Sequence, residues 1–322
     1  MDRRFFSSTL LALAGGLALP STALAAEFPT KPITLIVGAA AGSGTDAFAR
    51  FVGRKLSSRL GQPVIVDNRP GASGMLGARF VRTATPDGYT LLFAPSSLVA
   101  NVAVFKNPGY DPIEDFLPIA RLGKAPFVVA VRAGLNISSV GELVAYARSR
   151  PGQTNFGSAS GAYQIVNELF VKSTSIRAVH IPYKGTPQLV TDLVSGQIDF
   201  AIVDYGVVAP LEKSGRLRIL AVTGDRRLAL EPNVPTLQET GFPVDILGAW
   251  VGIYAPAKIP PEIAKKLTDN LLAVTAESDF HSFLTQFQYE NFPGDGTTFA
   301  AFTLAEAKAW AKGAEIARVE KQ

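Results

Sequence analysis

The feature that most constrains this chain is a regular alternation of short apolar runs with segments of helical period. The run Ile33–Val37 is mostly apolar, follows a proline and ends at a glycine, which is typical of a buried parallel strand. Phe48, Val52 and Leu56 then recur at helical spacing, and Gly61 stands where that helix should end. Strands that alternate with helices in this way predict an α/β fold.

The alternation continues along the chain. We predict further strands at Val64–Val66, Tyr89–Ala94, Phe127–Val131, Thr154–Gly157, Ala178–Ile181, Ile198–Val203, Leu217–Val222 and Ala249–Tyr254. So many crossovers in roughly 300 residues predict two lobes, each a mainly parallel sheet flanked by helices. We expect the chain to cross between lobes near Phe127–Val131 and Ala249–Tyr254. Residues 26–124 plus 250–322 would form the first lobe, and residues 125–249 the second.

Residues 1–25 have the pattern of a secretory signal peptide. Arg3 and Arg4 give a positive start, and the apolar run Leu10–Leu19 is too short for a stable membrane span. Ala23-Leu24-Ala25 fits a cleavage site, which places cleavage near Ala25/Ala26. An uncleaved anchor or a buried N-terminal helix is the alternative, and the general secretory and twin-arginine routes both stay open. Because the chain has no cysteine to carry a lipid, we expect an exported protein without a lipid anchor.

Composition excludes several kinds of chemistry. Without cysteine, the chain cannot form disulfides, thiolate nucleophiles or iron–sulfur clusters. Only His180 and His281 could offer imidazole to a metal, and no calcium-binding loop motif occurs, so we expect no metal and no cofactor. The net charge is +4, but the basic residues are scattered, so we expect no nucleic-acid binding.

Small and hydroxyl-bearing residues follow several predicted strands, at the points where helices begin. They are Gly42, Ser43, Gly44, Thr45, Ser96, Ser158, Ser160, Gly161, Gly185 and Thr186. Ligands of open α/β sheets bind at the carboxyl ends of strands, and a helix start offers free N–H groups with partial positive charge. Any single turn of this kind is more often an ordinary cap, but the set predicts an anion site. We expect Thr186 to cap its helix, with Pro187 at the first helical position.

Two other functions match parts of this pattern. Gly42-x-Gly44-x-x-Ala47, with Asp67 after the next strand, partly fits a dinucleotide-binding loop, although a lone match is weak. Ser158 or Ser160 with His180 would suit an exported serine hydrolase. The G-x-S-x-G elbow of such enzymes is missing, and His180 falls inside a predicted strand, which favours a structural role.

Four side chains near these turns are ambiguous. Asp46 and Asp204 are isolated carboxylates rather than an evident acid–base pair. Asp46 stands near a helix start, where the helix dipole favours a carboxylate, and Asp204 ends a strand, where it could orient a water or a donor in the cleft. Tyr163 and Tyr183 either pack between lobes or form a wall against the carbon skeleton of a ligand.

Segments along most of the chain resemble the Bug family, the periplasmic solute-binding receptors of tripartite tricarboxylate transporters. The motifs that carry the resemblance are, in order, NRPGASG, PDGYTLL, PYKG, LAVT with a following arginine, and PNVPT with a following E-x-G-x-P. The resemblance implies a two-lobe periplasmic-binding-protein fold of type II, the Venus-flytrap fold, without catalysis or a cofactor. It implies a small organic carboxylate held between the lobes and delivered to integral membrane permease subunits, with a monomer as the default. A receptor that signals to a sensor has the same fold and stays an alternative.

Carried over by position, the resemblance implies a set of ligand-binding residues. They are Gly42, Ser43, Gly44, Thr45 and Asp46 in the first loop, Ser158, Ser160 and Gly161 in the facing loop, and Lys184, Gly185, Thr186 and Asp204 nearby. Ser96 and Tyr163 join them from the pattern described above.

The chain departs from the usual family pattern at two points. Its first loop reads AAGSGTD where the family is closer to AAGGSTD, which moves a hydroxyl by one position. Tyr163-Gln164 stands where Ser-His is common. We expect Tyr163 to narrow the pocket and to favour an aromatic or apolar-chained carboxylate.

Overall fold

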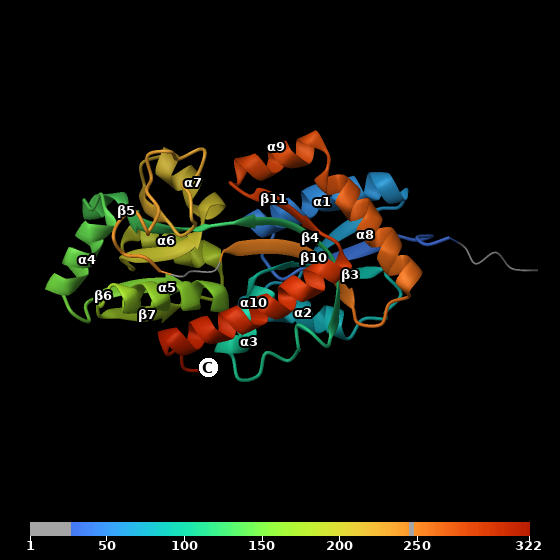
Figure 1. The fold of residues 1–322 in the computed structure, drawn as a ribbon, viewed down its shortest axis with the longest axis horizontal. Helices are drawn as coiled ribbons and strands as arrows, with labels where there is room; N and C mark the ends of the chain where they lie inside the picture. Colours follow the sequence, from blue (N-terminus) through green and yellow to red (C-terminus); the bar gives the residue numbers. More distant parts are fainter. Residues whose placement is uncertain (1–26, 245–247) are drawn as a thin grey trace, which may run out of the picture.

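The computed structural model describes residues 27–244 and 248–322. The predicted signal peptide, residues 1–25, and its cleavage site lie outside the described residues. Two β-sheets lie side by side along the long axis of the molecule, each with helices around it (Figure 1). Among the helices of the described part, none combines the length and the apolar character that a membrane crossing requires.

The first sheet has six strands in the order β11-β4-β10-β3-β1-β2. They are β1 (Ile33–Val37), β2 (Val64–Asn68), β3 (Thr90–Pro95), β4 (Phe116–Ala125), β10 (Ala249–Pro256) and β11 (Glu290–Gly294). The helices associated with it are α1 (Gly44–Leu60), α2 (Met75–Arg82), α3 (Ser97–Val104), α8 (Pro261–Thr275), α9 (Ser278–Gln286) and α10 (Gly296–Ala317). Strand β1 is parallel to β2 and β3, whereas β10 is antiparallel to β3 and β4, and β11 is antiparallel to β4.

The second sheet has five strands in the order β7-β6-β8-β5-β9. They are β5 (Phe127–Arg132), β6 (Thr154–Ser158), β7 (Ala178–Pro182), β8 (Phe200–Asp204) and β9 (Leu217–Val222). Its helices are α4 (Val140–Ser149), α5 (Gly161–Ser173), α6 (Thr186–Ser195) and α7 (Tyr205–Lys213). Strand β6 is parallel to β7 and β8, whereas β5 is antiparallel to β8 and β9.

The predicted α/β fold is confirmed, but the sheets are mixed rather than mainly parallel. Every antiparallel pair contains β4, β5 or β10, the strands nearest the passages between sheets, and the other strands in these pairs are β3, β8, β9 and β11. Only Pro126 separates β4 from β5, so no helix reverses the chain there.

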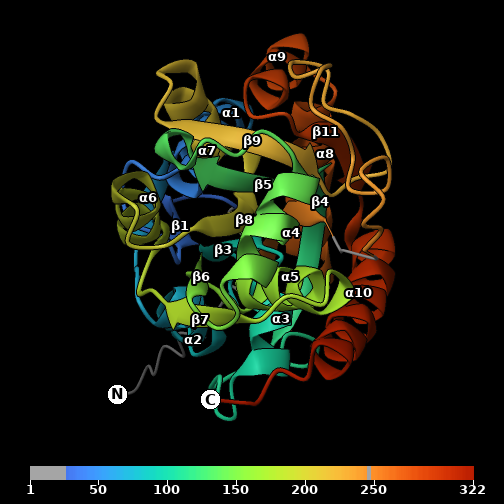
Figure 2. The ribbon, with the colours of Figure 1, turned by 90° about the vertical axis from the view of Figure 1, so that its left-hand side faces the viewer.

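Helix α10 packs against elements of both sheets. It lies against β4 and also contacts α3 and α5, as the end-on view shows (Figure 2). Trp250 on β10 and Trp310 on α10 are both fully buried, and both indole N–H groups donate to Glu306 Oε2, at 2.8 Å and 3.0 Å. Because Trp250 donates to a residue of α10, this shared acceptor holds α10 against β10, the strand with which the chain returns from the second sheet to the first.

Candidate functional site

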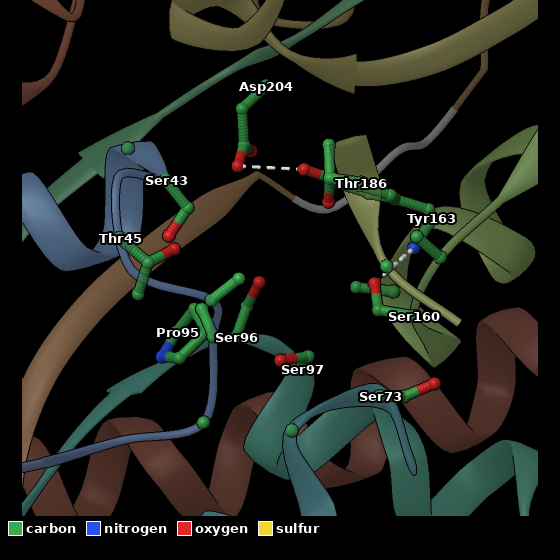
Figure 3. A pocket seen from close by; sticks show the side chains of 18 of the residues that line it. Ser43, Thr45, Ser73, Pro95, Ser96, Ser97, Ser160, Tyr163, Thr186 and Asp204 are labelled. Atoms are coloured by element: carbon green, nitrogen blue, oxygen red, sulfur yellow. Dashed lines mark hydrogen bonds between the residues drawn. The ribbon is translucent and has the colours of Figure 1, made fainter. Parts of the chain in front are cut away.

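A cavity of about 680 Å³ lies between the two sheets. The first turns of α1, α3, α5, α6 and α7 contribute to its wall, together with the loop before α2 (Figure 3). Each of these helix starts presents N–H groups that the helix itself leaves unbonded, and each carries partial positive charge. The sequence therefore brings several anion-favouring turns to one place.

Most of the predicted site residues line this cavity. They are Gly42, Ser43, Gly44, Thr45, Ser96, Ser160, Tyr163, Lys184, Gly185, Thr186 and Asp204. Three predicted residues, Asp46, Ser158 and Gly161, lie outside its wall. Their hydrogen bonds assign them supporting positions instead.

Asp46 organises the loop before α1. Its Oδ2 accepts from the N–H of Gly42 at 2.8 Å and from Arg50 Nε at 3.0 Å, and its Oδ1 accepts from Asn68 Nδ2 at 2.9 Å. Burial opposes ionisation of this carboxyl, but the hydrogen bonds from Arg50, Gly42 and Asn68 outweigh burial and hold its pKa below the usual value. With both oxygens occupied, Asp46 fixes the shape of the loop.

The loop leaves two backbone donors at the cavity. Ser43 is the N-cap of α1, and its Oγ accepts from the N–H of Asp46 at 3.2 Å. The N–H groups of Gly44 and Thr45 have no acceptor among the described residues. Gly42 has a φ of +80°, which a glycine adopts without strain. The hydroxyl at position 43 thus serves the cap through a lone pair, and its hydrogen has no acceptor among the described residues.

On the facing side, Ser160 caps α5 by accepting from the N–H of Tyr163 at 3.3 Å. The N–H of Gly161 donates to Oδ1 of Asn101 at 2.9 Å, so this predicted ligand donor is already bonded within the protein. The N–H of Ala162 has no acceptor in the described part of the chain. The contact from Asn101 was missed at the level of sequence, because nothing in the local pattern links this residue with the turn before α5, 60 residues further on.

Ser158 pairs with His180, at 2.6 Å between Oγ and Nε2. The His180 ring stacks on Phe156, and burial lowers its pKa, which favours the neutral form. The pair lines a smaller cavity of about 350 Å³ that shares Ser73, Ala159, Ser160 and Lys184 with the main one. Among the described residues no carboxylate bonds the ring, so a serine–histidine–acid triad is not formed there.

The start of α6 corrects one prediction. Thr186 is the first residue of the helix rather than its cap, and Gly185 is the N-cap. Because Gly185 has no side chain to accept a hydrogen bond, the N–H groups of Thr186 and Gln188 find no acceptor in the described residues. Lys184 is the sole cationic side chain that the described residues give to the cavity wall.

Tyr163 and Asp204 form a hydrogen-bonded pair inside the cavity. The Tyr163 hydroxyl donates to Asp204 Oδ2 at 2.9 Å (Figure 3). The Tyr163 ring also meets Phe127 edge to face. Burial raises the pKa of Asp204 to about 6. Its Oδ1 is buried and has no hydrogen-bond partner among the described residues. The sequence placed both residues near the ligand but gave no signal for their bond.

Aromatic rings cover much of the remaining wall. Phe48, Phe93 and Phe127 come from regular elements, whereas Phe287 and Tyr289 come from the connection between α9 and β11. Their role escaped sequence analysis because nothing in the local pattern links this connection with the glycine-rich turns. Asp67, which a dinucleotide site would require, is paired with Arg69 and does not line the cavity.

Within residues 27–244 and 248–322, no cluster of three or more His, Asp or Glu side chains is arranged to hold a metal ion. The wall of the cavity instead combines backbone N–H groups, hydroxyls and aromatic surface. Such a wall suits an anion with a carbon skeleton.

Comparison with known proteins identifies the relatives of this chain. The family described as "Tripartite tricarboxylate transporter family receptor" matches residues 48–316. Protein BugT of Bordetella pertussis is 35% identical over 77% of this chain and 77% of its own length. The solved structure of Rpa4515 of R. palustris with adipate is 30% identical, has a TM-score of 0.88 and covers 92% of this chain and 100% of the other. MatC (Rpa3494) of Rhodopseudomonas palustris with bound malate is 28% identical, with a TM-score of 0.82 and coverage of 89% and 99%.

Proposed function

Because the chain belongs to the family of tripartite tricarboxylate transporter receptors, we propose that it captures a small organic carboxylate in the cavity between its two sheets. Proteins of this family, and the structures that the chain resembles, are solute-binding proteins rather than enzymes. The observation that carries the proposal is the convergence of helix starts on one cavity. Two similar structures hold adipate and malate, which are both carboxylates.

The ligand carboxylate would be held chiefly by backbone N–H groups. Those of Gly44, Thr45, Ala162 and Thr186 are unbonded within the described residues and belong to helices from both sheets. Hydroxyls of Ser43, Ser96 and Ser160 would add donors. Hydrogen bonds to a charged group contribute about 1.5–3 kcal/mol each, so a few of them suffice for tight binding. Asp46, Ser158 and Gly161 would support these donors rather than touch the ligand.

A thermal-shift screen of the mature chain, starting near Ala26 and stripped of ligand by unfolding and refolding, tests this function. Mono-, di- and tricarboxylates are compared with sugars, phosphates and amino acids. A ligand at 100 times its Kd stabilises by about 2.7 kcal/mol, which is a shift of several degrees. A shift with one class of carboxylate and none with sugars or phosphates supports the proposal. A chain that responds to none of the carboxylates contradicts it.

Tyr163 would select the carbon skeleton. Its ring is buried and faces Phe127 at the cavity, so we propose a preference for an aromatic or apolar-chained carboxylate. Tyr163→Ser should then change the ranking of ligands, whereas Tyr163→Phe, which keeps the ring, should retain the preference among skeletons. An unchanged ranking in Tyr163→Ser would show that the ring does not contribute to selection.

Ligand capture would draw the two lobes together. We propose residues 26–124 plus 250–322 as one lobe and 125–249 as the other, because the cavity takes its wall from both. Small-angle scattering should give a smaller radius of gyration at saturation with ligand. An unchanged radius would count against closure.

The chain would work in the periplasm after loss of residues 1–25 and deliver its ligand to integral membrane permease subunits. Co-purification of the liganded chain with such subunits, but not of the ligand-free chain, is the expected result. Capture of a sensor protein instead would favour the signalling alternative. We also propose a monomer, which light scattering after size exclusion would check.

A further inference from the structure

Asp204 is an unusual group for a cavity that favours anions. It is the only carboxylate that the described residues place in the wall, and its side chain points into the cavity beside Tyr163 (Figure 3). Its Oδ2 accepts one hydrogen bond, from the Tyr163 hydroxyl, and its Oδ1 accepts none within the described part of the chain. A carboxylate has about four acceptor positions, so most of this group's capacity is unused.

The surroundings compensate the charge only weakly. Asp204 forms no ion pair with a described residue, and the Tyr163 hydroxyl is the one hydrogen-bond donor that the described residues give its side chain. Asp204 is also the N-cap of α7, but its side chain accepts no hydrogen bond from that helix, so the helix start offers it partial positive charge without a donor. Lys184, the cation of the wall, is exposed and does not bond it. A buried acceptor without a donor is costly, and the cost falls when a ligand brings the donor.

We infer that the ligand carries, in addition to its carboxylate, a hydrogen-bond donor, a hydroxyl or an ammonium group, which binds the carboxylate of Asp204. This inference rests on the proposed function. The helix starts would hold the acid group, and the Tyr163–Asp204 pair would receive the donor. A ligand with a second carboxylate at that end would bring an acceptor and a like charge to Asp204 and would bind less well.

The experiment compares ligands that differ only at the end distant from the carboxylate. Straight-chain acids of four to eight carbons are tested as methyl-ended, ω-hydroxy, ω-amino and ω-carboxy forms, and 3-phenylpropanoate is paired with its 4-hydroxy form. Calorimetry is run at pH 8. At the best chain length, we expect a donor-ended form to bind at least about tenfold more tightly than its methyl-ended partner. Which of the hydroxy and amino series binds tighter identifies the donor.

Asp204→Asn is the matched variant. Its side-chain oxygen can still accept from Tyr163, and its amide NH₂ then replaces Oδ1 and reverses the polarity of the site. The preference should invert, so that the ω-carboxy form gains over the donor-ended form. Tyr163→Phe leaves Asp204 in place and should retain the preference for donors. The melting temperature of each variant without ligand checks that it is folded.

Two outcomes separate the failure of this inference from that of the proposed function. If carboxylates bind without preference for a donor, or if Asp204→Asn leaves the preference unchanged, the inference is wrong and the receptor function stands. If no acid of either series binds and the broader carboxylate screen is also negative, the proposed function falls and this inference falls with it.

Discussion

The N–H of Gly161 donates to Oδ1 of Asn101 across 2.9 Å, and this bond joins the first turn of α5 to helix α3. The amide of Asn101 also donates to the carbonyl oxygen of Ser73, at 2.9 Å, in the loop before α2. Asn101 is only 1% exposed. One side chain therefore holds three segments from both sheets together beside the cavity.

We predict that Asn101→Ala lowers the free energy of unfolding by about 2–4 kcal/mol, because the buried N–H of Gly161 and the half-buried carbonyl of Ser73 lose their partner. Urea unfolding measures the change. Asn270→Ala is the control, since Asn270 bonds only a carbonyl of its own helix and should cost about 1 kcal/mol or less. Equal effects of the two substitutions would show that the bridge contributes no more than an ordinary helix contact.

Gly161→Ala should separate α5 from α3. A Cβ there would lie 2.9 Å from Asn101 Oδ1, closer than real Cβ contacts come, and 3.1 Å from the Ala100 carbonyl oxygen, which is tighter than most such contacts. We expect the free energy of unfolding to fall by about 1–3 kcal/mol and ligand binding to become weaker. Gly141→Ala is the control, because its Cβ would meet nothing nearer than 3.9 Å and alanine favours the helix. Comparable melting temperatures for the two variants would contradict the prediction.

Asp46→Asn should weaken carboxylate binding without a contact to the ligand. The substitution removes the charge that holds Arg50 and loosens the loop whose N–H groups face the cavity. We expect a loss of about tenfold in affinity by calorimetry, equal for all ligands of a series. Asp67→Asn removes an exposed pair with Arg69 and should leave affinity unchanged. A change in ligand ranking in Asp46→Asn would indicate direct contact instead.

Asp204 should make stability depend on pH. Its pKa is raised by burial from 3.8 to about 6, so the folded state binds the proton more tightly than the unfolded state. This tighter proton binding adds to the free energy of unfolding below about pH 4, where Asp204 is protonated, and the contribution is lost as the pH rises through 6. The free energy of unfolding of Asp204→Asn should therefore exceed that of the native chain by about 1–3 kcal/mol at pH 8, and this difference should shrink near pH 4. Urea unfolding at both pH values checks the sign, and a constant difference would contradict it.

The sequence predicted the strands with continuous apolar runs and missed those that contain breakers. Strand β4 was not predicted because Pro118, Arg121, Gly123 and Lys124 interrupt it. Arg121 is nevertheless buried, because its guanidinium lies over the rings of Phe292 and Phe302 and its N–H groups bond backbone carbonyls. Tertiary partners far along the chain overcome the local preference, and a local pattern cannot reveal them.

The same limit applies to the site. The turns at residues 42–45 and 158–161 were predicted because glycine and hydroxyl residues at helix starts have a local meaning. That the N–H of Gly161 is already bonded depends on Asn101, which lies 60 residues away in the sequence. The bond between Tyr163 and Asp204 likewise arises only when α5 lies beside β8.

The shared acceptor of the two tryptophans has a practical consequence for spectroscopy. Trp250 and Trp310 are the only tryptophans in the chain, and both donate to Glu306. Indole emission therefore originates entirely from the region where β10 and α10 meet, and the second sheet contributes none of it. A ligand that changes the indole emission must alter the surroundings of that junction, so fluorescence can report whether β10 and α10 respond to ligand without any added label.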